Sequence, residues 1–196
     1  MEQPKTARGR QTRAAIIETA AGLMYQRGVR ATSLDDVLEA AKCGKSQLYH
    51  YFAGRSELLA AVVEYQLQEV LGDQGIHRLD TWTGLRSWFD SLVARQQERG
   101  FRGCPLGSLV AEMAAEDDRL REVIAVAYAR WEEALRLPLM HMRHTGRLAR
   151  SARPDELARH VLSAIQGGYL LSTIRHEAGP MREALDAAYE HLRAAR

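Results

Sequence analysis

Cysteine, lysine and long apolar runs are all scarce in this 196-residue sequence, and the first and last of these scarcities each exclude a class of protein. Two cysteines, Cys43 and Cys104, are too few for a disulfide framework. The longest apolar stretch, residues 161–174, contains Gln166 and is shorter than the about 20 residues that a transmembrane helix needs. Residues 1–11 are polar and charged, without the apolar segment of a secretory signal. We therefore expect a cytoplasmic protein with reduced thiols and no membrane partner.

Net charge is also low, +2 at pH 7, so the overall charge identifies no partner. Its distribution along the chain is more informative. The first thirty residues contain six basic residues against two acidic ones, a local excess of four positive charges. Lysine occurs only at Lys5, Lys42 and Lys45. A basic leading segment of this kind is typical of proteins that bind nucleic acid.

Residues 33–59 carry the most informative pattern in the chain. Apolar residues at helical spacing predict one short helix over residues 33–41, with a hydroxyl of Thr32 or Ser33 as its cap. The sequence Lys42-Cys43-Gly44 interrupts the period. A second short helix over residues 45–51 would then direct Leu48 inward and its polar side chains outward. The pattern predicts a helix-turn-helix whose second helix can lie in the major groove of DNA.

A family resemblance is specific in this region. The run Gln47-Leu48-Tyr49-His50-Tyr51-Phe52, followed by Arg55 and Glu57, resembles the recognition-helix signature of TetR-type transcriptional regulators. The segment from Gly28 to Val37 is similar to the start of the same motif. Two positions depart from the family pattern, which usually has Gly where this chain has Lys42 and Ser where it has Gly44. Either Lys42 adopts a left-handed conformation at some cost, or Gly44 absorbs the strain.

The residue types in this motif suggest a role for each candidate DNA contact. Lysine and tyrosine reach phosphates, whereas serine, glutamine and histidine can read base edges. The positive N-terminus of the helix that begins near Arg55 would favour a phosphate. We expect phosphate contacts from Thr32, Ser33, Tyr49 and Arg55, a phosphate or guanine contact from Lys45, and base contacts from Gln47, Ser46 and His50.

Helical periodicity continues to the end of the chain without a convincing strand, so we expect an all-α fold. Residues 1–10 should form a mobile arm, and residues 72–75 (Gly-Asp-Gln-Gly) should separate two domains. We expect a three-helix helix-turn-helix DNA-binding domain over residues 1–55 and a connecting helix over 56–75. A helical effector-binding and dimerisation domain would follow over 76–196. The expected helices are 12–26, 33–41, 45–51, 56–71, 82–98, 105–115, 117–138, 154–176 and 181–193.

The last two expected helices are candidates for a dimer surface. The TetR resemblance implies a homodimer that places two recognition helices about one DNA turn (~34–36 Å) apart on a pseudo-palindromic operator. Gly167-Gly168 lies inside a helix, where glycine is unfavourable, so we expect a close backbone approach there. The alternative is that these faces only fill the core of one subunit. The stripe consists of Leu157, Val161, Ala164, Ile165, Gly168 and Leu171, with Leu185, Ala188 and Leu192 on the last helix.

The resemblance also implies an effector cavity in the second domain, for a small hydrophobic or electrophilic molecule. The segment from Cys104 through Leu109 and Glu112 resembles an N-ethylmaleimide-responsive branch of repressors, in which such a cysteine senses electrophiles or oxidants. Arg102 and a helix N-terminus would both favour the reactive thiolate. Buried cysteine, however, is usually a small packing residue. The candidate ligand contacts are Trp82, Phe89, Phe101, Cys104, Met113, Tyr128 and Trp131, each of which could equally be ordinary core.

These patterns favour a ligand-responsive, homodimeric DNA-binding repressor, with an electrophile-sensing repressor acting through Cys104 as the alternative. A helical enzyme with a catalytic Cys104 is disfavoured, because no base lies at a recognisable spacing from it. The second domain could also bind a protein or serve only for dimerisation. We expect no cofactor and no metal, since His141 and His144 share a helix face without a third ligand.

Overall fold

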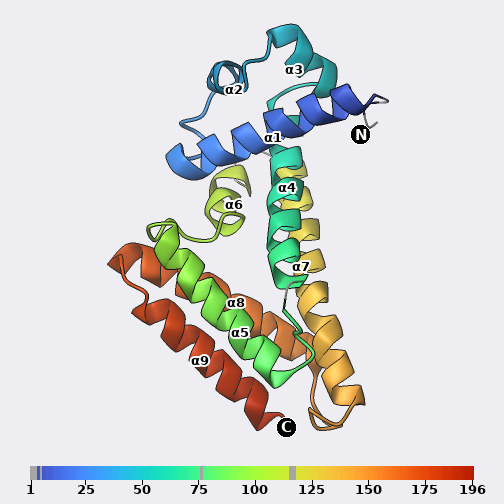
Figure 1. Cartoon of the computed structure of the whole chain (residues 1–196), viewed down its shortest axis with the longest axis vertical. Helices are drawn as coiled ribbons and strands as arrows, with labels where there is room; N and C mark the ends of the chain where they lie inside the picture. The colour runs from blue at the N-terminus through green and yellow to red at the C-terminus, as the bar shows by residue number, and fades with distance from the viewer. Residues whose placement is uncertain (1–3, 5, 76, 115–117) are drawn as a thin grey trace. The chain divides into compact units, whose positions relative to one another are not determined.

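A computed structural model describes residue 4 and residues 6–75, 77–114 and 118–196. Over these residues the chain forms helices and no strand, so the expected all-α fold is confirmed. None of the helices described is both long enough and apolar enough to cross a bilayer. Figure 1 shows the helices in order: α1 (Ala7–Arg27), α2 (Leu34–Ala40), α3 (Lys45–Tyr51), α4 (Arg55–Gly75), α5 (Trp82–Glu98), α6 (Gly107–Ala114), α7 (Asp118–His144), α8 (Pro154–Arg175) and α9 (Gly179–Ala194).

Three helices extend beyond the limits that the sequence suggested. Helix α1 begins at Ala7, so a mobile arm over residues 1–10 is wrong for residues 7–10; Thr6 caps the helix, its Oγ1 accepting the N–H of Gly9 at 3.1 Å. Residues 72–75 belong to α4 and do not break it. Helix α7 continues through Pro138 to His144. Helix α4 therefore passes Gly72 and ends at Gly75, and Pro138 does not end α7.

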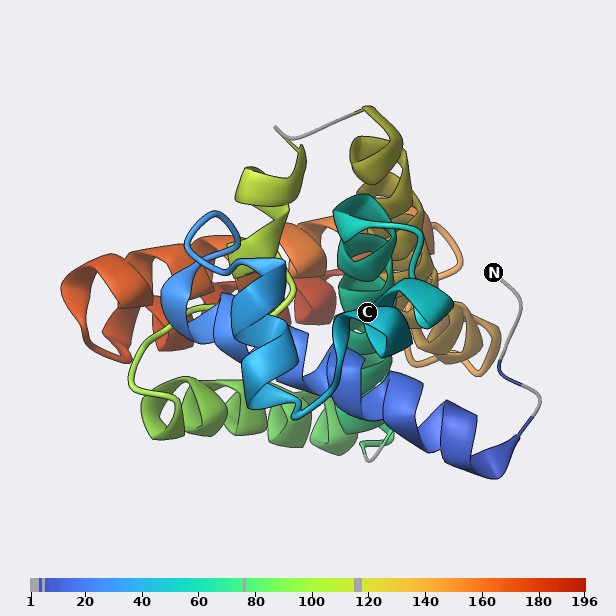
Figure 2. The ribbon, with the colours of Figure 1, turned by 90° about the horizontal axis from the view of Figure 1, so that it is seen from above.

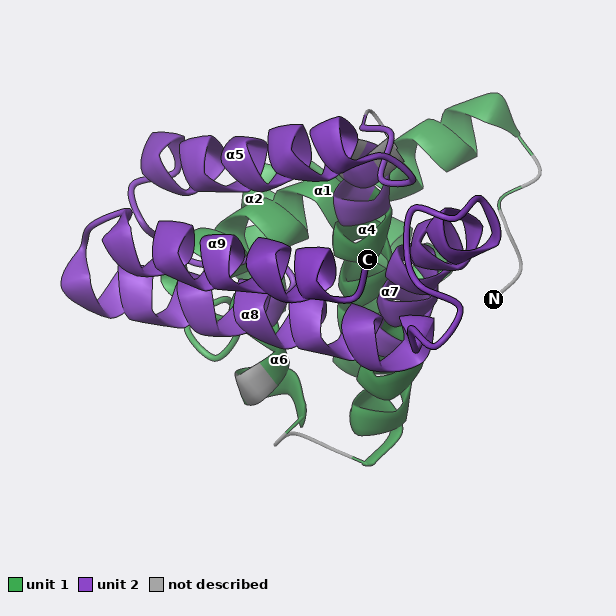
Figure 3. Ribbon diagram, turned by 90° about the horizontal axis from the view of Figure 1, so that it is seen from below, with its two compact units in different colours: residues 1–68, 108–127 green, residues 69–107, 128–196 purple. Residues whose placement is uncertain are grey.

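The chain divides into two compact units (Figure 3), and the first contains residues 1–68 and 108–127. Within this unit, α1 lies beside both α2 and α3 (Figures 1 and 2). The three helices bury an apolar core because each has one apolar face. Its members include Ile16, Ala20, Met24, Val37 and Leu48, each at most 1% exposed.

The second unit contains residues 69–107 and 128–196. Helices α8 and α9 pack along each other, and α5 packs on α9 (Figure 3). Gly168 is needed for this packing: a Cβ there would lie 2.7 Å from the sulfur of Met181 and 3.1 Å from its Cα. The expected close backbone approach is therefore confirmed at Gly168, whereas a Cβ on Gly167 would meet no atom within 4 Å.

The predicted dimer stripe is wrong for most of its members, and the alternative, that it fills the core of one subunit, is correct for them. Leu157, Val161, Ile165 and Gly168 of α8 are buried within the chain, as are Leu185, Ala188 and Leu192 of α9. Helix α8 exposes one member of the stripe, Leu171, together with two large apolar residues outside it. Leu170 is 61% exposed, Leu171 46% and Ile174 70%.

Candidate functional site

The turn between α2 and α3 is built by local hydrogen bonds. Ser33 caps α2: its Oγ accepts the N–H of Asp36 at 3.1 Å, and Asp36 Oδ2 accepts the N–H of Ser33 at 2.7 Å. The hydrogen bond from the Ser33 hydroxyl, and then that from its backbone, lower the pKa of Asp36. After α2, Lys42 adopts φ 50°, in the left-handed region, whereas Gly44 has φ −83°. Of the two alternatives for this turn, Lys42 therefore takes the strain.

Helix α3 separates its side chains by polarity. Leu48 is fully buried, which fixes the helix on the unit's core. The polar residues around it are exposed, and the hydroxyl-bearing ring of Tyr49 is 55% exposed. The sequence predicts that these side chains project together from one short helix, and in the structure they are all exposed on α3. They are Lys45, Ser46, Gln47, Tyr49 and His50.

Two of the exposed side chains have partners within the motif. Lys45 Nζ lies 3.3 Å from Asp35 Oδ1, and both side chains are exposed. Surface ion pairs of this kind contribute little to stability, so the ammonium group can exchange its partner for a phosphate. Gln47 Oε1 accepts the N–H of Gly44 at 3.3 Å, a long bond that holds the side chain over the start of α3. Both side chains are thus oriented before any ligand binds.

Thr32 and Arg55 do not belong to this exposed surface. Thr32 is fully buried, and its hydroxyl donates to the carbonyl of Gly28 at 2.8 Å, so it is not placed to reach a phosphate. The guanidinium of Arg55 donates to the carbonyls of Thr32 at 2.7 Å and Val29 at 2.6 Å. These bonds fasten the start of α4 to the segment before α2. The structure therefore gives Arg55 a bracing role that its position in the sequence does not reveal.

Helix α6 contributes a further bond to the first unit. Glu112 Oε2 accepts the backbone N–H of Arg30 at 3.0 Å, which ties α6 to the connection between α1 and α2. The two residues are 82 positions apart, and no local sequence signal pairs them. Sequence reasoning therefore missed Glu112 as a support of the helix-turn-helix.

The interior of the second unit holds a cavity of about 20 Å³, room for about one water molecule. Of the seven candidate ligand contacts, only Cys104 and Trp131 line it, and the ring of Tyr128 lies 5.8 Å from that of Trp131. The other candidates lie elsewhere: Trp82 and Phe89 near Tyr189, Phe101 near His176, and Met113 in the first unit. The remaining lining residues are Val70, Trp88, Leu92, Arg95, Arg99, Pro105 and Tyr169.

Cys104 is 3% exposed, and its burial raises the pKa of the thiol. The expectation that its surroundings favour the thiolate is therefore wrong, because desolvation outweighs hydrogen bonds from the backbone and from Gln166. Burial likewise raises the pKa of Tyr128. Within the described residues, Trp131 Nε1 and Gln96 Oε1 are buried without a hydrogen-bond partner.

A larger pocket, of about 370 Å³ and open to solvent, was not anticipated from the sequence. It lies among the end of α4, the connection from α4 to α5, and α7. Gln74 was not predicted as a lining residue because residues 72–75 have the composition of a linker. Pro138, inside a helical pattern, was the one local signal of an irregularity in the wall. The lining residues are Leu71, Gln74, His77, Arg78, Leu79, Asp80, Ala134 and Pro138.

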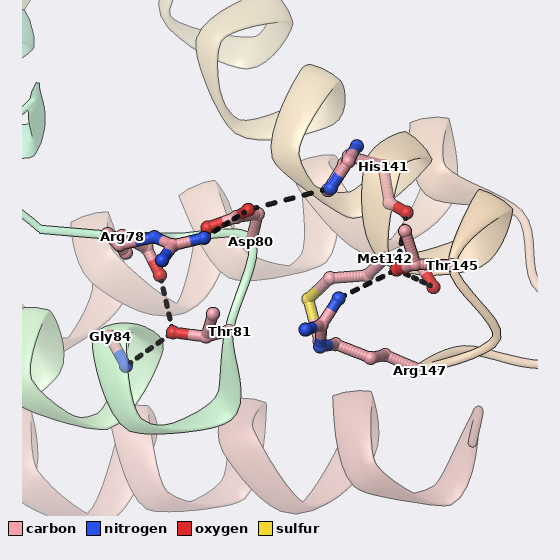
Figure 4. Close-up of polar contacts among 8 residues, drawn as sticks. All are labelled: Arg78, Asp80, Thr81, Gly84, His141, Met142, Thr145 and Arg147. Carbon is pink, nitrogen blue, oxygen red and sulfur yellow. Dashed lines mark hydrogen bonds and ion pairs between the residues drawn. The ribbon is translucent and has the colours of Figure 1, made fainter.

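An open groove of about 640 Å³ at the end of α7 includes both His141 and His144, together with Leu137, Met140, Arg143 and Arg150. His141 Nε2 lies 3.6 Å from Asp80 Oδ2 (Figure 4). Across the described part of the chain, no three His, Cys, Asp or Glu side chains are grouped as a metal site requires.

Curated relatives resemble the chain over nearly its full length. An HTH-type transcriptional regulator of Mycobacterium tuberculosis is 29% identical over 192 residues, 92% of each chain. The HTH-type transcriptional regulator LmrA of Bacillus subtilis is 26% identical over 175 residues, covering 87% of this chain and 90% of that one.

Solved structures share the fold. The TetR-family transcriptional regulator from Cytophaga hutchinsonii has a TM-score of 0.82 at 18% identity and covers 98% of both chains. The reduced form of NemR from E. coli has a TM-score of 0.79 at 21% identity, covering 94% of this chain and 99% of that one. At these identities the likeness establishes the fold alone.

Family models match both parts of the sequence. Residues 16–62, which contain α2 and α3, match the model for bacterial regulatory proteins of the tetR family. Residues 82–187 match the model described as the C-terminal domain of LmrA/YxaF-like transcriptional regulators. With the helix-turn-helix geometry and the all-α fold, these matches show that the chain belongs to the TetR family of transcriptional regulators.

Proposed function

We propose that this protein is a homodimeric repressor that binds a pseudo-palindromic operator through α3 and leaves it when a small molecule binds the second unit. The observation that carries the proposal is the exposed polar face of α3, held on the core by the buried Leu48. The N-terminal family match supports a helix-turn-helix role for the same segment.

Each exposed side chain of α3 has a role in this proposal. Lys45 would leave Asp35 for a phosphate or a guanine, and Tyr49 would donate its hydroxyl to a phosphate. Gln47 would read a base, giving up its long bond to Gly44, and Ser46 and His50 would read neighbouring positions. Ser33 lies exposed at the start of α2 and could add a phosphate contact, but its hydroxyl already serves Asp36.

The outer face of α8 supports a homodimer. Leu170, Leu171 and Ile174 are large, exposed and on one helix, and burial of such residues favours association. A second copy of the chain is the partner that the family suggests. Two α3 helices held about one DNA turn apart (~34–36 Å) would then match a pseudo-palindromic site.

An effector that binds beside Cys104 needs a conformational change, because the cavity there holds about 20 Å³. An effector that binds an expanded state would shift the population toward it. Cys104 and Pro105 line the cavity, and the chain runs directly from them into α6, which Glu112 ties to Arg30. We infer that α6 carries the change to the helix-turn-helix. In this scheme residues 1–55 bind DNA, 56–75 connect, and 76–196 bind the effector and the second subunit.

The test uses an operator selected from a random DNA pool by the wild-type protein. Lys45→Ala should weaken binding to all sequences and reduce the slope of log affinity against log salt by about 1. Gln47→Ala should lower affinity for the selected operator by about 1–3 kcal/mol while non-specific binding changes little. Arg150→Ala, which removes an exposed arginine from the second unit, is the control. Unchanged operator affinity in both α3 variants would remove this helix from the interface.

A further inference from the structure

An acidic side chain lies at the polar surface that α3 exposes. Asp35, in the first turn of α2, places its Oδ1 3.3 Å from Nζ of Lys45, the first residue of α3. The side chain of Asp35 is 74% exposed and that of Lys45 70%. The carboxylate is therefore beside a group proposed to contact DNA, where the negative charge of the phosphates would repel it.

Folding of the helix-turn-helix does not explain this carboxylate. Asp36 caps α2 through Ser33, and Glu57 Oε2 accepts the N–H of Ala53 at 2.6 Å. Asp36 also supplies a negative charge to the positive end of α2. In the described part of the chain the side chain of Asp35 pairs with Lys45, and an ion pair between exposed groups contributes little to stability. Asp35 thus adds little to the fold that its neighbour does not already supply.

Binding of Lys45 to a phosphate would take the ammonium group away from Asp35. The carboxylate would then face DNA without its counter-ion, which is unfavourable where water is partly excluded. A base can satisfy it only with a hydrogen-bond donor, and the major groove offers two, N4 of cytosine and N6 of adenine. Adenine places the acceptor N7 beside its amino group, whereas cytosine has a C–H in that place. Cytosine is therefore the favoured partner.

We propose that Asp35 is a specificity-determining residue, which accepts a hydrogen bond from N4 of a cytosine at one position in each half-site when Lys45 moves to a phosphate. The inference rests on the proposed DNA-binding role of α3 and extends the contact surface to α2. On DNA without that cytosine, the carboxylate has lost Lys45 and gained no donor. Asp35 thus weakens the wrong complexes more than the right one, which raises specificity.

The first test uses the operator that the wild-type protein selects from a random DNA pool. Each C·G pair is replaced in turn by T·A, which puts the acceptor O4 where N4 stood. At one position of each half-site this change should weaken wild-type binding at least about tenfold, and that of Asp35→Ala less than about twofold. Glu39→Ala removes an exposed carboxylate one turn further along α2 and should keep the wild-type preference. Because Asp35 is exposed and alanine favours helices, the variant should fold, which circular dichroism checks.

The second test measures affinity for non-operator DNA at about 0.1 M salt. Asp35→Ala should bind it at least about threefold more tightly than the wild type, because an unpaired carboxylate has been removed from beside the phosphates. Glu39→Ala should show a smaller increase. Equal strengthening on operator and non-operator DNA, with every base preference intact, would mean that Asp35 only repels phosphates and would overturn the proposal. Weaker binding of Asp35→Ala to both would also overturn it, because the carboxylate would then only orient Lys45.

Failure of the proposed function gives a different result. Operator affinity that changes in neither Lys45→Ala nor Gln47→Ala would remove α3 from the interface, and the role of Asp35 would fall with it. If those two variants behave as expected and the cytosine preference persists in Asp35→Ala, α3 binds DNA but Asp35 does not read a base.

Discussion

The two units of this protein treat buried polar groups in opposite ways. In the first unit, the fully buried Thr32 is bonded at both its hydroxyl and its carbonyl, to Gly28 and to Arg55. In the described part of the second unit, Gln74, Gln96 and Trp131 each bury a polar atom without a partner. The helix-turn-helix is thus held by satisfied polar groups, whereas the described second unit contains buried polar atoms that have no partner.

The modification rate of Cys104 is the strongest test of this comparison of the two units. In a Cys43→Ala variant, N-ethylmaleimide should modify Cys104 at least about a hundredfold more slowly in the native protein than in urea, measured by mass spectrometry at pH 7. Burial both blocks access and, by raising the thiol pKa, leaves little thiolate to react. The rate should rise with pH and should still be rising above the ordinary thiol pKa, because the raised pKa of Cys104 moves the plateau to higher pH. Cys104→Ala, which leaves the half-buried Cys43, is the matched control.

Rapid native modification of Cys104 would show that the interior opens readily. It would also restore the electrophile-sensing alternative, for which the small cavity and the raised thiol pKa give no specific support.

Removing the brace of the first unit should have the next largest effect. Arg55→Met deletes two charge-assisted hydrogen bonds; the carbonyl of Thr32 loses this donor, whereas that of Val29 keeps the N–H of Thr32. We expect the free energy of unfolding, measured in urea, to fall by about 2–3 kcal/mol. Arg30→Met removes an exposed guanidinium from the same unit and should change it by less than about 0.5 kcal/mol. Equal stability of the two variants would contradict the bracing role.

A smaller effect is expected at the bond between α6 and the α1–α2 connection. Glu112→Ala removes the acceptor of the Arg30 N–H and should lower the free energy of unfolding by about 1 kcal/mol. Glu112→Gln keeps an oxygen in the same place and should stay close to the wild type. If both variants behave alike, the carboxylate oxygen is not what holds α6 in this unit.

The parts of the fold that the sequence predicted correctly depend on interactions between near neighbours. Helix α3 has the expected limits because Leu48 and the turn before it act within a few residues. Ser33 was recognised as a cap for the same reason. The brace from Arg55 was missed because its bonds span 23 and 26 positions. Glu112 was missed for the same reason, because its bond to the N–H of Arg30 spans 82 positions.

The predicted helix lengths were wrong where local helix propensity and tertiary packing favour different limits. Gly72 disfavours a helix by about 1 kcal/mol relative to alanine, yet α4 continues through it to Gly75. Packing of an apolar face outweighs such local costs in most protein helices. The cavity around Gln74 was invisible for a related reason, since only the folded chain shows which walls surround a side chain. The DNA contacts, the effector contacts and the three-part division of the chain stay predictions.

The adjacent glycines of α8 have different freedom to change during evolution. At position 168 any side chain would push α8 away from Met181, so selection should retain glycine for as long as these two helices stay together. At position 167 a methyl group meets nothing within the subunit, and alanine there would favour the helix by up to about 1 kcal/mol. Glycine at 167 is therefore dispensable to the single chain. Its retention among related sequences would point to a neighbour that arrives only on assembly.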